Sequence, residues 1–263
     1  QPLVLDFARV PALAGTLSAP LGGLLSLALH HGATLQELNL QRPIHDLLVA
    51  NGFLKVYRAG VRQPPRDFLG TTIGYQHFQA DQYAAFIQHY LREGVAAKGL
   101  PGVAPLLRRQ FEQGLFELLE NARQHAASPV GIFCCGDLDP DGGLLRFCVA
   151  DLGRGIPANV RAFLGRRIGS ADAIAWVMQE GHTTRTGDVP GGLGLKLVLE
   201  FLQAHRGTLR ILSANGYWES AAGEVVRAEL SVPFPGTVVW LELDTAHAAA
   251  AEPPAPVDAG AIF

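Results

Sequence analysis

Three polar residues recur at one-turn intervals in the most strongly helical segment of the chain. Glu117, Asn121 and His125 are spaced four residues apart, so they lie along one stripe of a helix. A carboxylate one turn from a carboxamide can orient a water molecule and hold a hard cation through oxygen. Because a lone E-x-x-x-N pattern is more often a solvated polar face, the stripe carries weight only together with other motifs.

The second motif is Asp151-Leu-Gly-Arg-Gly-Ile-Pro157, which directly follows an apolar run ending at Ala150. An aspartate at the end of a strand can accept hydrogen bonds in a partly dry pocket, as the amino group of adenine requires. Gly153 and Gly155 allow the backbone to approach a planar ring closely. A strand-to-helix turn with Asp151 as its cap is the simpler alternative.

The third motif is Gly191-Gly-Leu-Gly-Leu-Lys196, which leads into an apolar helix. Glycines before a helix start expose backbone N–H groups that can bind phosphates at the positive helix end. The pattern does not fit G-x-x-x-x-G-K-[ST], so it is no P-loop. It also lacks the βαβ context of a dinucleotide fingerprint.

The elements expected to position these motifs follow from hydrophobic periodicity. Apolar residues at three- and four-residue spacing predict a long helix over 105–126. Apolar runs at 130–135 and 144–150, joined by the turn at 139–143, predict a hairpin. The remaining pattern of the second half predicts two helices within 158–180, a helix over 193–204, and strands over 208–212, 225–232 and 238–243.

The first sixty residues follow a β-α-β-α order, which favours a small parallel sheet. The expected elements are a strand over 3–7, a helix over 19–31, a strand over 34–40 and a helix over 44–50. A further strand over 71–78 and a helix from Asp81 to Tyr90 follow the Pro64-Pro65 break. The expected organisation is therefore a module at 1–58, a linker at 59–70, a larger domain at 71–245 and an Ala/Pro-rich disordered tail at 246–263.

In this order and spacing, the three motifs resemble the nucleotide-binding boxes of the gyrase, heat-shock chaperone, histidine kinase and MutL (GHKL) ATPase superfamily. "ELLENARQHA" resembles its N box, "DLGRGIP" its first glycine box and "GGLGLKLV" its second. The resemblance covers about residues 71–244. It implies an α/β fold of the Bergerat type, a two-layer sandwich with a mixed sheet and helices on one face, that binds ATP and Mg²⁺.

The resemblance also implies roles for single residues. Glu117 would be the general base, and Asn121 would hold Mg²⁺, which bridges the phosphates. Asp151 would bind the adenine amino group, with Gly153 and Gly155 shaping that wall.

The same resemblance assigns the phosphate side of the site. Gly191, Gly192 and Gly194, with Leu195 and Lys196, would meet the phosphates. Thr237, in the late Gly-Thr pair, resembles the threonine that supports the adenine-binding aspartate through water. The stretch 158–190 would be the ATP lid, in which His182, Thr183, Thr184 and Arg185 could reach the γ-phosphate.

The N-terminal piece resembles the later half of a STAS domain, the α/β module of anti-sigma-factor antagonists. The matching stretches are "LVLDFARV", "LGGLLSLALHHG" and "IHDLLVANGFL". Phosphorylatable STAS modules carry a short Asp-Ser/Thr-Ser/Thr-Gly segment before the helix. Here the region reads Thr16-Leu-Ser-Ala-Pro20, without the aspartate.

Composition limits the other classes of function. A net charge of -3 provides no global field for nucleic acid or anionic membrane. No apolar run is long enough to span a bilayer, and Cys134, Cys135 and Cys148 are interpreted as buried strand thiols. These features suit a reducing cytoplasm.

Three functions fit the motifs. The first is an ATP-dependent protein kinase or anti-sigma-type switch that phosphorylates a partner protein. The second is an ATP-hydrolysing conformational switch of the gyrase or MutL kind, and the third is a nucleotide-binding interaction module without turnover. The sequence does not identify the phosphoacceptor or the pathway, and it does not decide whether the protein forms a homodimer.

Overall fold

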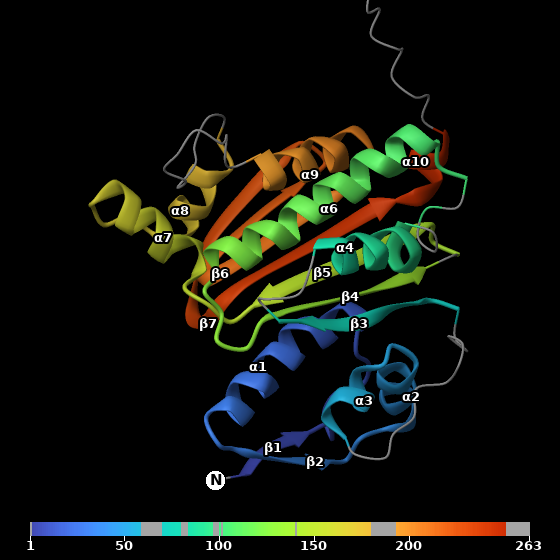
Figure 1. Cartoon of the computed structure of the whole chain (residues 1–263), viewed down its shortest axis with the longest axis vertical. Helices are drawn as coiled ribbons and strands as arrows, with labels where there is room; N and C mark the ends of the chain where they lie inside the picture. Colours follow the sequence, from blue (N-terminus) through green and yellow to red (C-terminus); the bar gives the residue numbers. More distant parts are fainter. Residues whose placement is uncertain are drawn as a thin grey trace, which may run out of the picture.

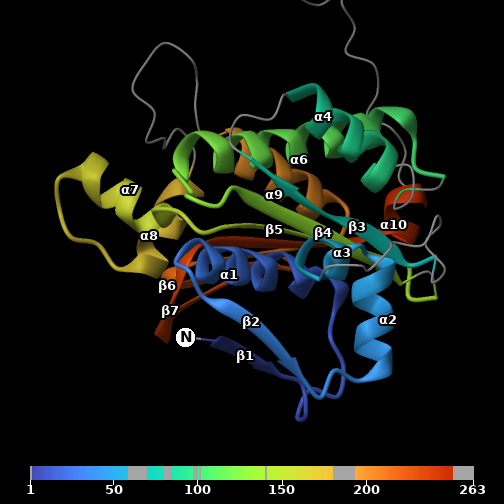
Figure 2. The same ribbon diagram turned by 60° about the horizontal axis from the view of Figure 1, so that its bottom comes forward.

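The computed structural model describes residues 2–58, 70–79, 84–96, 100, 102–139, 141–179 and 193–250. Figures 1 and 2 show a large sheet with helices on one side and a smaller unit on the other. This smaller unit, residues 2–58, is called the N-terminal unit below. None of the helices in the described ranges combines the length and the apolar character that crossing a bilayer requires.

The large sheet has five strands in the order β3 (Thr72–Phe78), β4 (Ile132–Asp139), β5 (Leu144–Asp151), β7 (Glu224–Asp244) and β6 (Thr208–Ala221). All four neighbouring pairs are antiparallel. A separate pair, β1 (Pro2–Asp6) and β2 (Thr34–Leu38), is parallel. The predicted α/β sandwich is confirmed. Its sheet was expected to be mixed, but its four strand pairs are all antiparallel, and the parallel pair belongs to the separate two-stranded sheet.

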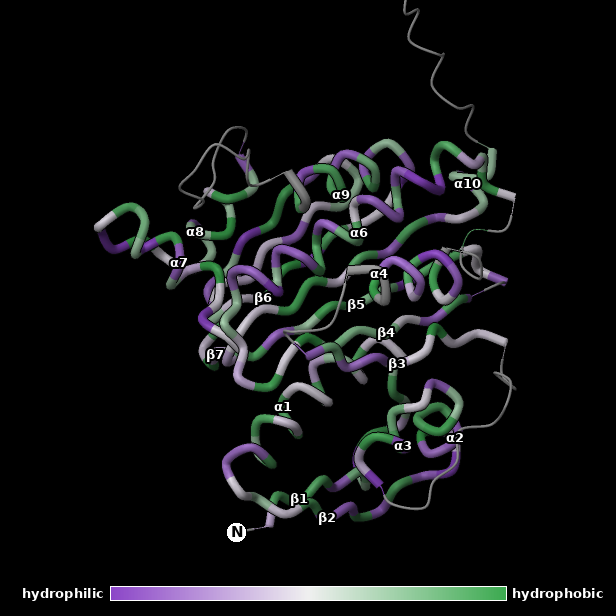
Figure 3. Tube along the Cα trace, viewed as in Figure 1, coloured by the Kyte–Doolittle hydropathy of each residue, from purple (hydrophilic) through white to green (hydrophobic). Residues whose placement is uncertain are grey.

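The central strands are apolar at successive positions because both faces of the sheet are covered. Side chains alternate between the two faces of a strand. Ile132 and Cys134 therefore enter the core beneath the helices, whereas Phe133 and Cys135 enter the core shared with the N-terminal unit. The hydrophobic stretches of these strands are visible in Figure 3.

One face of the sheet carries α6 (Pro105–His125) and α9 (Leu193–Ala204), with α4 (Ala84–His89), the π-helix η2 (Tyr90–Ala96) and α10 (Thr245–Ala250) nearby. The helix predicted over 105–126 is confirmed. Its apolar stripe, including the buried Leu107, Phe111 and Leu115, faces the core. The ring of Phe111 contacts that of Phe201 on α9, with centroids 5.4 Å apart.

The N-terminal unit covers the opposite face. It adds η1 (Gly15–Leu17), α1 (Ser18–His30), α2 (Arg42–Ala50) and α3 (Phe53–Tyr57) to its two strands, which confirms the predicted β-α-β-α order and parallel pairing. Helix α1 lies against β4 and β5 (Figure 2). A Cβ atom at Gly23 of α1 would lie 2.1 Å from Leu152 Cδ2, so the glycine permits this close contact.

Buried hydrogen bonds join the N-terminal unit to the edge strand β3. Asn51 is fully buried and donates from Nδ2 to Ser18 Oγ at 2.9 Å, and its carbonyl accepts from the Tyr75 N–H at 2.7 Å. The hydroxyl of Tyr57 donates to the Gly22 carbonyl at 2.8 Å and lies 2.7 Å from the hydroxyl of Tyr75. These polar groups are therefore satisfied within the junction, as buried groups must be.

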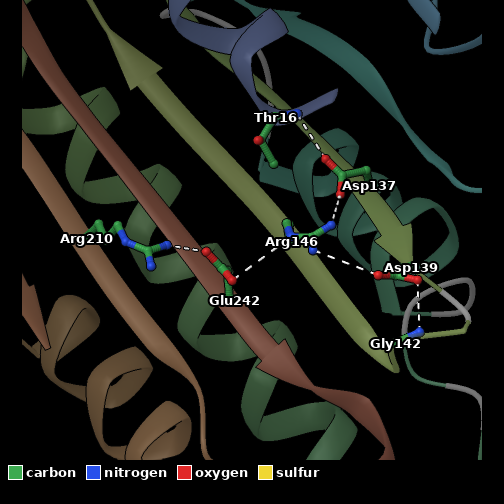
Figure 4. Close-up of polar contacts among 7 residues, drawn as sticks. All are labelled: Thr16, Asp137, Asp139, Gly142, Arg146, Arg210 and Glu242. Carbon is green, nitrogen blue, oxygen red and sulfur yellow. Dashed lines mark hydrogen bonds and ion pairs between the residues drawn. The ribbon is translucent and has the colours of Figure 1, made fainter. Parts of the chain in front are cut away.

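A row of charged side chains also crosses this face of the sheet (Figure 4). Arg146 of β5 forms an ion pair with Asp137 of β4 at 3.0 Å and lies 4.0 Å from Glu242 of β7. Glu242 in turn pairs with Arg210 of β6. Asp137 accepts a hydrogen bond from the Thr16 N–H at 3.2 Å, so the row ends on the backbone of η1.

The C-terminal part differs from the prediction in three places. The strand expected over 208–212 continues to Ala221 as β6. Strands expected separately over 225–232 and 238–243 form one strand, β7, with irregular pairing between Thr237 and Glu229. Pro233 and Pro235 do not break it because they lie outside the stretch paired with β5, which begins at Thr237. Residues 246–250, expected to begin a disordered tail, belong to α10, in which Ala248 is fully buried. Most of the expected linker and residues 251–263 lie outside the described residues.

Candidate functional site

A cavity of about 120 Å³ opens between the helices and the end of the sheet where β5 and β7 meet α6 and α7 (Gly155–Leu164). Figure 1 shows α6, α7 and α9 converging at this end of the sheet. The polar residues that line the cavity are Asn121, His125, Asp151, Asn159 and Thr237. The apolar residues that line it are Leu118, Ala122, Ala126, Val149, Ile156, Val160, Val177, Leu195 and Val239. An apolar cleft with a few convergent polar groups is the usual form of a small-molecule site.

Strand register brings the floor of the cavity together. Asp151 at the end of β5 is opposite Thr237 of β7, and Thr237 is opposite Ser213 of β6. Residues paired across strands point to the same face. The three side chains therefore lie in one row across β5, β7 and β6, beneath the helices.

Asp151 is the buried acid of the site, with 5% of its surface exposed. Burial raises the pKa of its carboxyl to about 6, and hydrogen bonds from the backbone N–H groups of Gly153 and Thr237 oppose that rise. The Gly153 N–H lies 2.9 Å from Asp151 Oδ1. Near neutral pH the side chain is therefore a desolvated hydrogen-bond acceptor facing the cavity.

The structure requires glycine at both glycine positions of this motif, for a different reason at each. A Cβ at Gly153 would lie 1.9 Å from the carbonyl oxygen of Ala126, at the end of α6. Gly155 has a φ of +73°, which a residue with a side chain rarely adopts. The Arg154 N–H also donates to the Ala126 carbonyl at 2.7 Å, so the loop is fixed to the end of α6.

The polar stripe of α6 only partly reaches the cavity. Asn121 and His125 belong to its lining, and Asn159 of α7 donates to the His125 carbonyl at 3.1 Å. Glu117 is half-buried one turn before Asn121 and is not among the lining residues. The structure thus groups Asn121 with Asp151 and leaves Glu117 beside the cavity.

The glycine-rich motif is only partly described. Gly191 and Gly192 lie outside the described residues, and so do His182, Thr183, Thr184 and Arg185. Gly194 is the second residue of α9, and Leu195 lines the cavity. Lys196 forms an ion pair with Glu200 one turn later, at 3.6 Å.

The first part of the stretch interpreted as a lid consists of docked helices. Residues 158–164 belong to α7, and α8 (Ser170–Val177) packs on β6. Ser170 donates from its hydroxyl to Asn215 Oδ1 at 2.8 Å, and the Ala171 N–H donates to Glu229 Oε1 at 2.8 Å. Residues 180–190 of that stretch lie outside the described residues.

Two polar residues near the cavity were missed from the sequence. Asn159 lies in a helix that was predicted, but no motif marks it. Ser213 is fully buried on β6, and its hydroxyl contacts both β7 and the start of α7. Its sequence signal is a serine within an apolar strand, directly after Ile211-Leu212, which only the strand register connects to Thr237.

The N-terminal unit packs on the opposite face of the strands that form the cavity floor. Asp151 points into the cavity, while the next residue, Leu152, points to the opposite core and packs against α1. The strand end that forms the floor of the cavity is thus also part of the junction with the N-terminal unit.

The sequence of residues 107–247 matches the family described as histidine kinase-, DNA gyrase B-, and HSP90-like ATPase. This match spans more than half of the chain. It includes α6 with Asn121, the Asp151 loop, α9 and the end of β7 with Thr237. The cavity with its buried aspartate lies within the matched region, and the chain therefore belongs to the family of histidine kinase-, DNA gyrase B- and HSP90-like ATPases, an ATP-binding family.

Proposed function

We propose that this protein is a Mg-ATP-dependent protein kinase of the histidine-kinase or anti-sigma-factor type. The observation that carries the proposal is the row of Asp151 and Thr237 on the cavity floor, with Asn121 on the facing helix. In this role Asp151 binds the adenine amino group and holds the base against the apolar wall. The glycine-rich segment 191–194, which leads into α9 in the sequence, meets the phosphates.

Asn121 suits the magnesium ion that the family usually binds with ATP. Its side chain lines the cavity and offers a carboxamide oxygen, a ligand type that hard cations accept. The described residues contain no group of three His, Cys, Asp or Glu side chains placed to hold a metal. The ion would therefore be held by Asn121 together with the phosphates, whose negative charge it would neutralise.

Glu117 is the proposed general base. It lies on α6 one turn before Asn121, which lines the cavity, although Glu117 itself is not among the lining residues. A carboxylate there can accept the proton of an attacking hydroxyl group or water molecule.

The structure of the N-terminal unit favours a separate protein as the phosphoacceptor. Its STAS-like order makes it a candidate docking element for such a partner. Thr16 and Ser18, the hydroxyl residues nearest to the STAS phosphorylation position, are 6% and 0% exposed and belong to elements that pack on the side of the sheet away from the cavity. Transfer within one docked chain would require the phosphate to cross the sheet, so the acceptor in this proposal is a separate protein.

An ATP-hydrolysing conformational switch is the second candidate. The contact between Leu152 and Gly23 favours it, because the strand end that would bind adenine also contacts α1. If nucleotide binding moved this strand end, the movement would be transmitted to the N-terminal unit through its contact with α1.

Incubation with γ-³²P-ATP and Mg²⁺, alone and with candidate acceptor proteins, tests these readings. A labelled protein that disappears with Glu117→Gln, but not with the same-helix control Glu112→Gln, is the expected result. Turnover falls by about 10²- to 10⁴-fold when a general base is lost, while ATP affinity is expected to remain. Free phosphate without labelled protein would favour the switch, and tight ATP binding with neither product would favour an interaction module.

A further inference from the structure

Ser213 has an unusual set of hydrogen-bond contacts for a serine inside an apolar strand. Its side chain is fully buried on β6. The hydroxyl oxygen accepts from the Ile156 N–H at 2.9 Å, lies 3.1 Å from the Gly236 carbonyl oxygen, and lies 2.9 Å from Thr237 Oγ1. It therefore joins β6, β7 and the start of α7 at the floor of the cavity.

The inventory of protons permits one arrangement of these contacts. A serine hydroxyl has one proton to donate and two lone pairs to accept. The carbonyl oxygen of Gly236 can only accept, so the proton of Ser213 points to it. The Ile156 N–H fills one lone pair, and the remaining contact is satisfied only if Thr237 donates its own proton to Ser213.

This arrangement fixes what Thr237 offers to a ligand. Its only hydroxyl proton is used by Ser213, so the oxygen can only accept from a group in the cavity. Thr237 and the neighbouring Asp151 both line the cavity. Two acceptors side by side favour a group with two N–H donors, such as the exocyclic amino group of adenine, and disfavour a carbonyl oxygen at the same position.

We propose that Ser213 is a positioning residue for nucleotide selectivity: it orients the Thr237 hydroxyl as an acceptor, so that the site prefers a 6-amino purine over a 6-oxo purine. The proposal rests on the proposed function, because it assumes that the purine lies against Asp151 and Thr237. Ser213 itself does not line the cavity among the described residues and acts through Thr237.

Calorimetric titration with ATP and with ITP, whose purine carries oxygen in place of the amino group, tests the proposal. The wild type is expected to prefer ATP. In Ser213→Ala the Thr237 hydroxyl is free to turn and donate to the ITP oxygen, so the ATP-to-ITP affinity ratio should narrow by about three- to tenfold, the value of one hydrogen bond. A change in overall stability alone would not alter this ratio.

Ser220→Ala is the matched control. Ser220 is also buried on β6, at 1% exposure, but accepts from Gln203 Nε2 at 3.3 Å, away from the cavity. Its ATP-to-ITP ratio is expected to stay at the wild-type value. If Ser213→Ala does not fold by circular dichroism, Ser213→Cys retains the side-chain shape with weaker hydrogen bonds and carries the same prediction.

Each outcome has a distinct meaning. A folded Ser213 variant with the wild-type ratio would overturn the role of Ser213 and leave the proposed function standing. A wild type that binds ATP and ITP equally would overturn the selectivity but not ATP binding. A wild type that binds neither would overturn both the inference and the proposed function.

Discussion

The two faces of the central sheet differ in how completely they are packed. The face beneath the N-terminal unit is filled by aromatic and aliphatic side chains, and its buried polar groups bond to one another. The face beneath the helices is equally apolar along most of its length, but it leaves a cavity at the end of β5 and β7. There, polar side chains point into the open space.

Adjacent residues show the contrast at single-residue scale. Asp151 faces the cavity, and Leu152 packs against α1 on the other side. Likewise, Thr237 lines the cavity while Val238 is fully buried in the core shared with the N-terminal unit. The comparison indicates that one face is built for stability and the other for a ligand, on the same strands.

The largest expected effect tests whether both faces are true cores. Phe133 and Phe147 are fully buried on adjacent strands but face opposite sides. Replacement of either by alanine should lower the free energy of unfolding by about 3–5 kcal/mol, measured by urea denaturation. A normal loss for Phe147→Ala with a loss below about 1 kcal/mol for Phe133→Ala would mean that the N-terminal unit does not pack on the sheet in solution.

A pair of aspartates on opposite faces separates ligand binding from stability. Asp151→Asn should weaken ATP binding by about 10- to 100-fold, the value of a hydrogen bond to a charged group. Asp137→Asn should leave ATP affinity unchanged but lower the free energy of unfolding by about 1–2 kcal/mol, because Arg146 and the Thr16 N–H lose a charged acceptor. Calorimetry and urea denaturation of both variants check this, and equal ATP affinities would contradict it.

The raised pKa of Asp151, about 6, predicts a pH dependence of ATP binding at the cavity face. The carboxylate is a stronger acceptor for the adenine amino group than the protonated acid, so ATP affinity should fall by up to about tenfold per pH unit below pH 6. Because the native state holds this proton more tightly than the unfolded state, the free energy of unfolding without nucleotide should decrease as pH rises from about 4 to 6. Titrations between pH 5 and 7.5 check the affinity, and Asp151→Asn should abolish its slope.

The smallest effect is expected at Glu242, which is more exposed than Asp137 in the charged row beside the N-terminal unit. Glu242 has 29% of its side chain exposed and joins Arg210 to Arg146. Glu242→Gln should lower the free energy of unfolding by less than about 1 kcal/mol, in contrast to the buried phenylalanines. A larger loss in 1 M salt than in low salt would contradict this view, because salt screens exposed pairs.

Much of the fold could be predicted from local pattern. The long helix α6, the β4–β5 hairpin and the β-α-β-α order of the N-terminal unit follow from periodicity and turn residues, which act over a few positions. Strand β7 was predicted as two separate strands. It continues through Pro233 and Pro235 because these residues lie outside the stretch that pairs with β5, where a proline would remove a ladder hydrogen bond.

Part of the candidate site could also be predicted, because some of its residues lie in short local motifs. Asn121, Asp151 and Thr237 lie in short motifs, and the structure brings all three to one cavity. Glu117 belongs to the same motif as Asn121, but its place relative to a phosphate depends on residues outside the described ranges. Ser213 and Asn159 carry no motif, since their position near the site results from strand register and helix docking.

The sequence by itself determined most of the secondary structure, the apolar character of the central strands and the residue types able to bind a nucleotide, because propensity, alternation and side-chain chemistry are local properties. Only the tertiary structure decided which element covers the second face of the sheet. It also decided which residues line the cavity and that Ser213 contacts Thr237. These facts depend on pairings between residues far apart in the chain, and such pairings exist only once the strands are in register and the helices are packed.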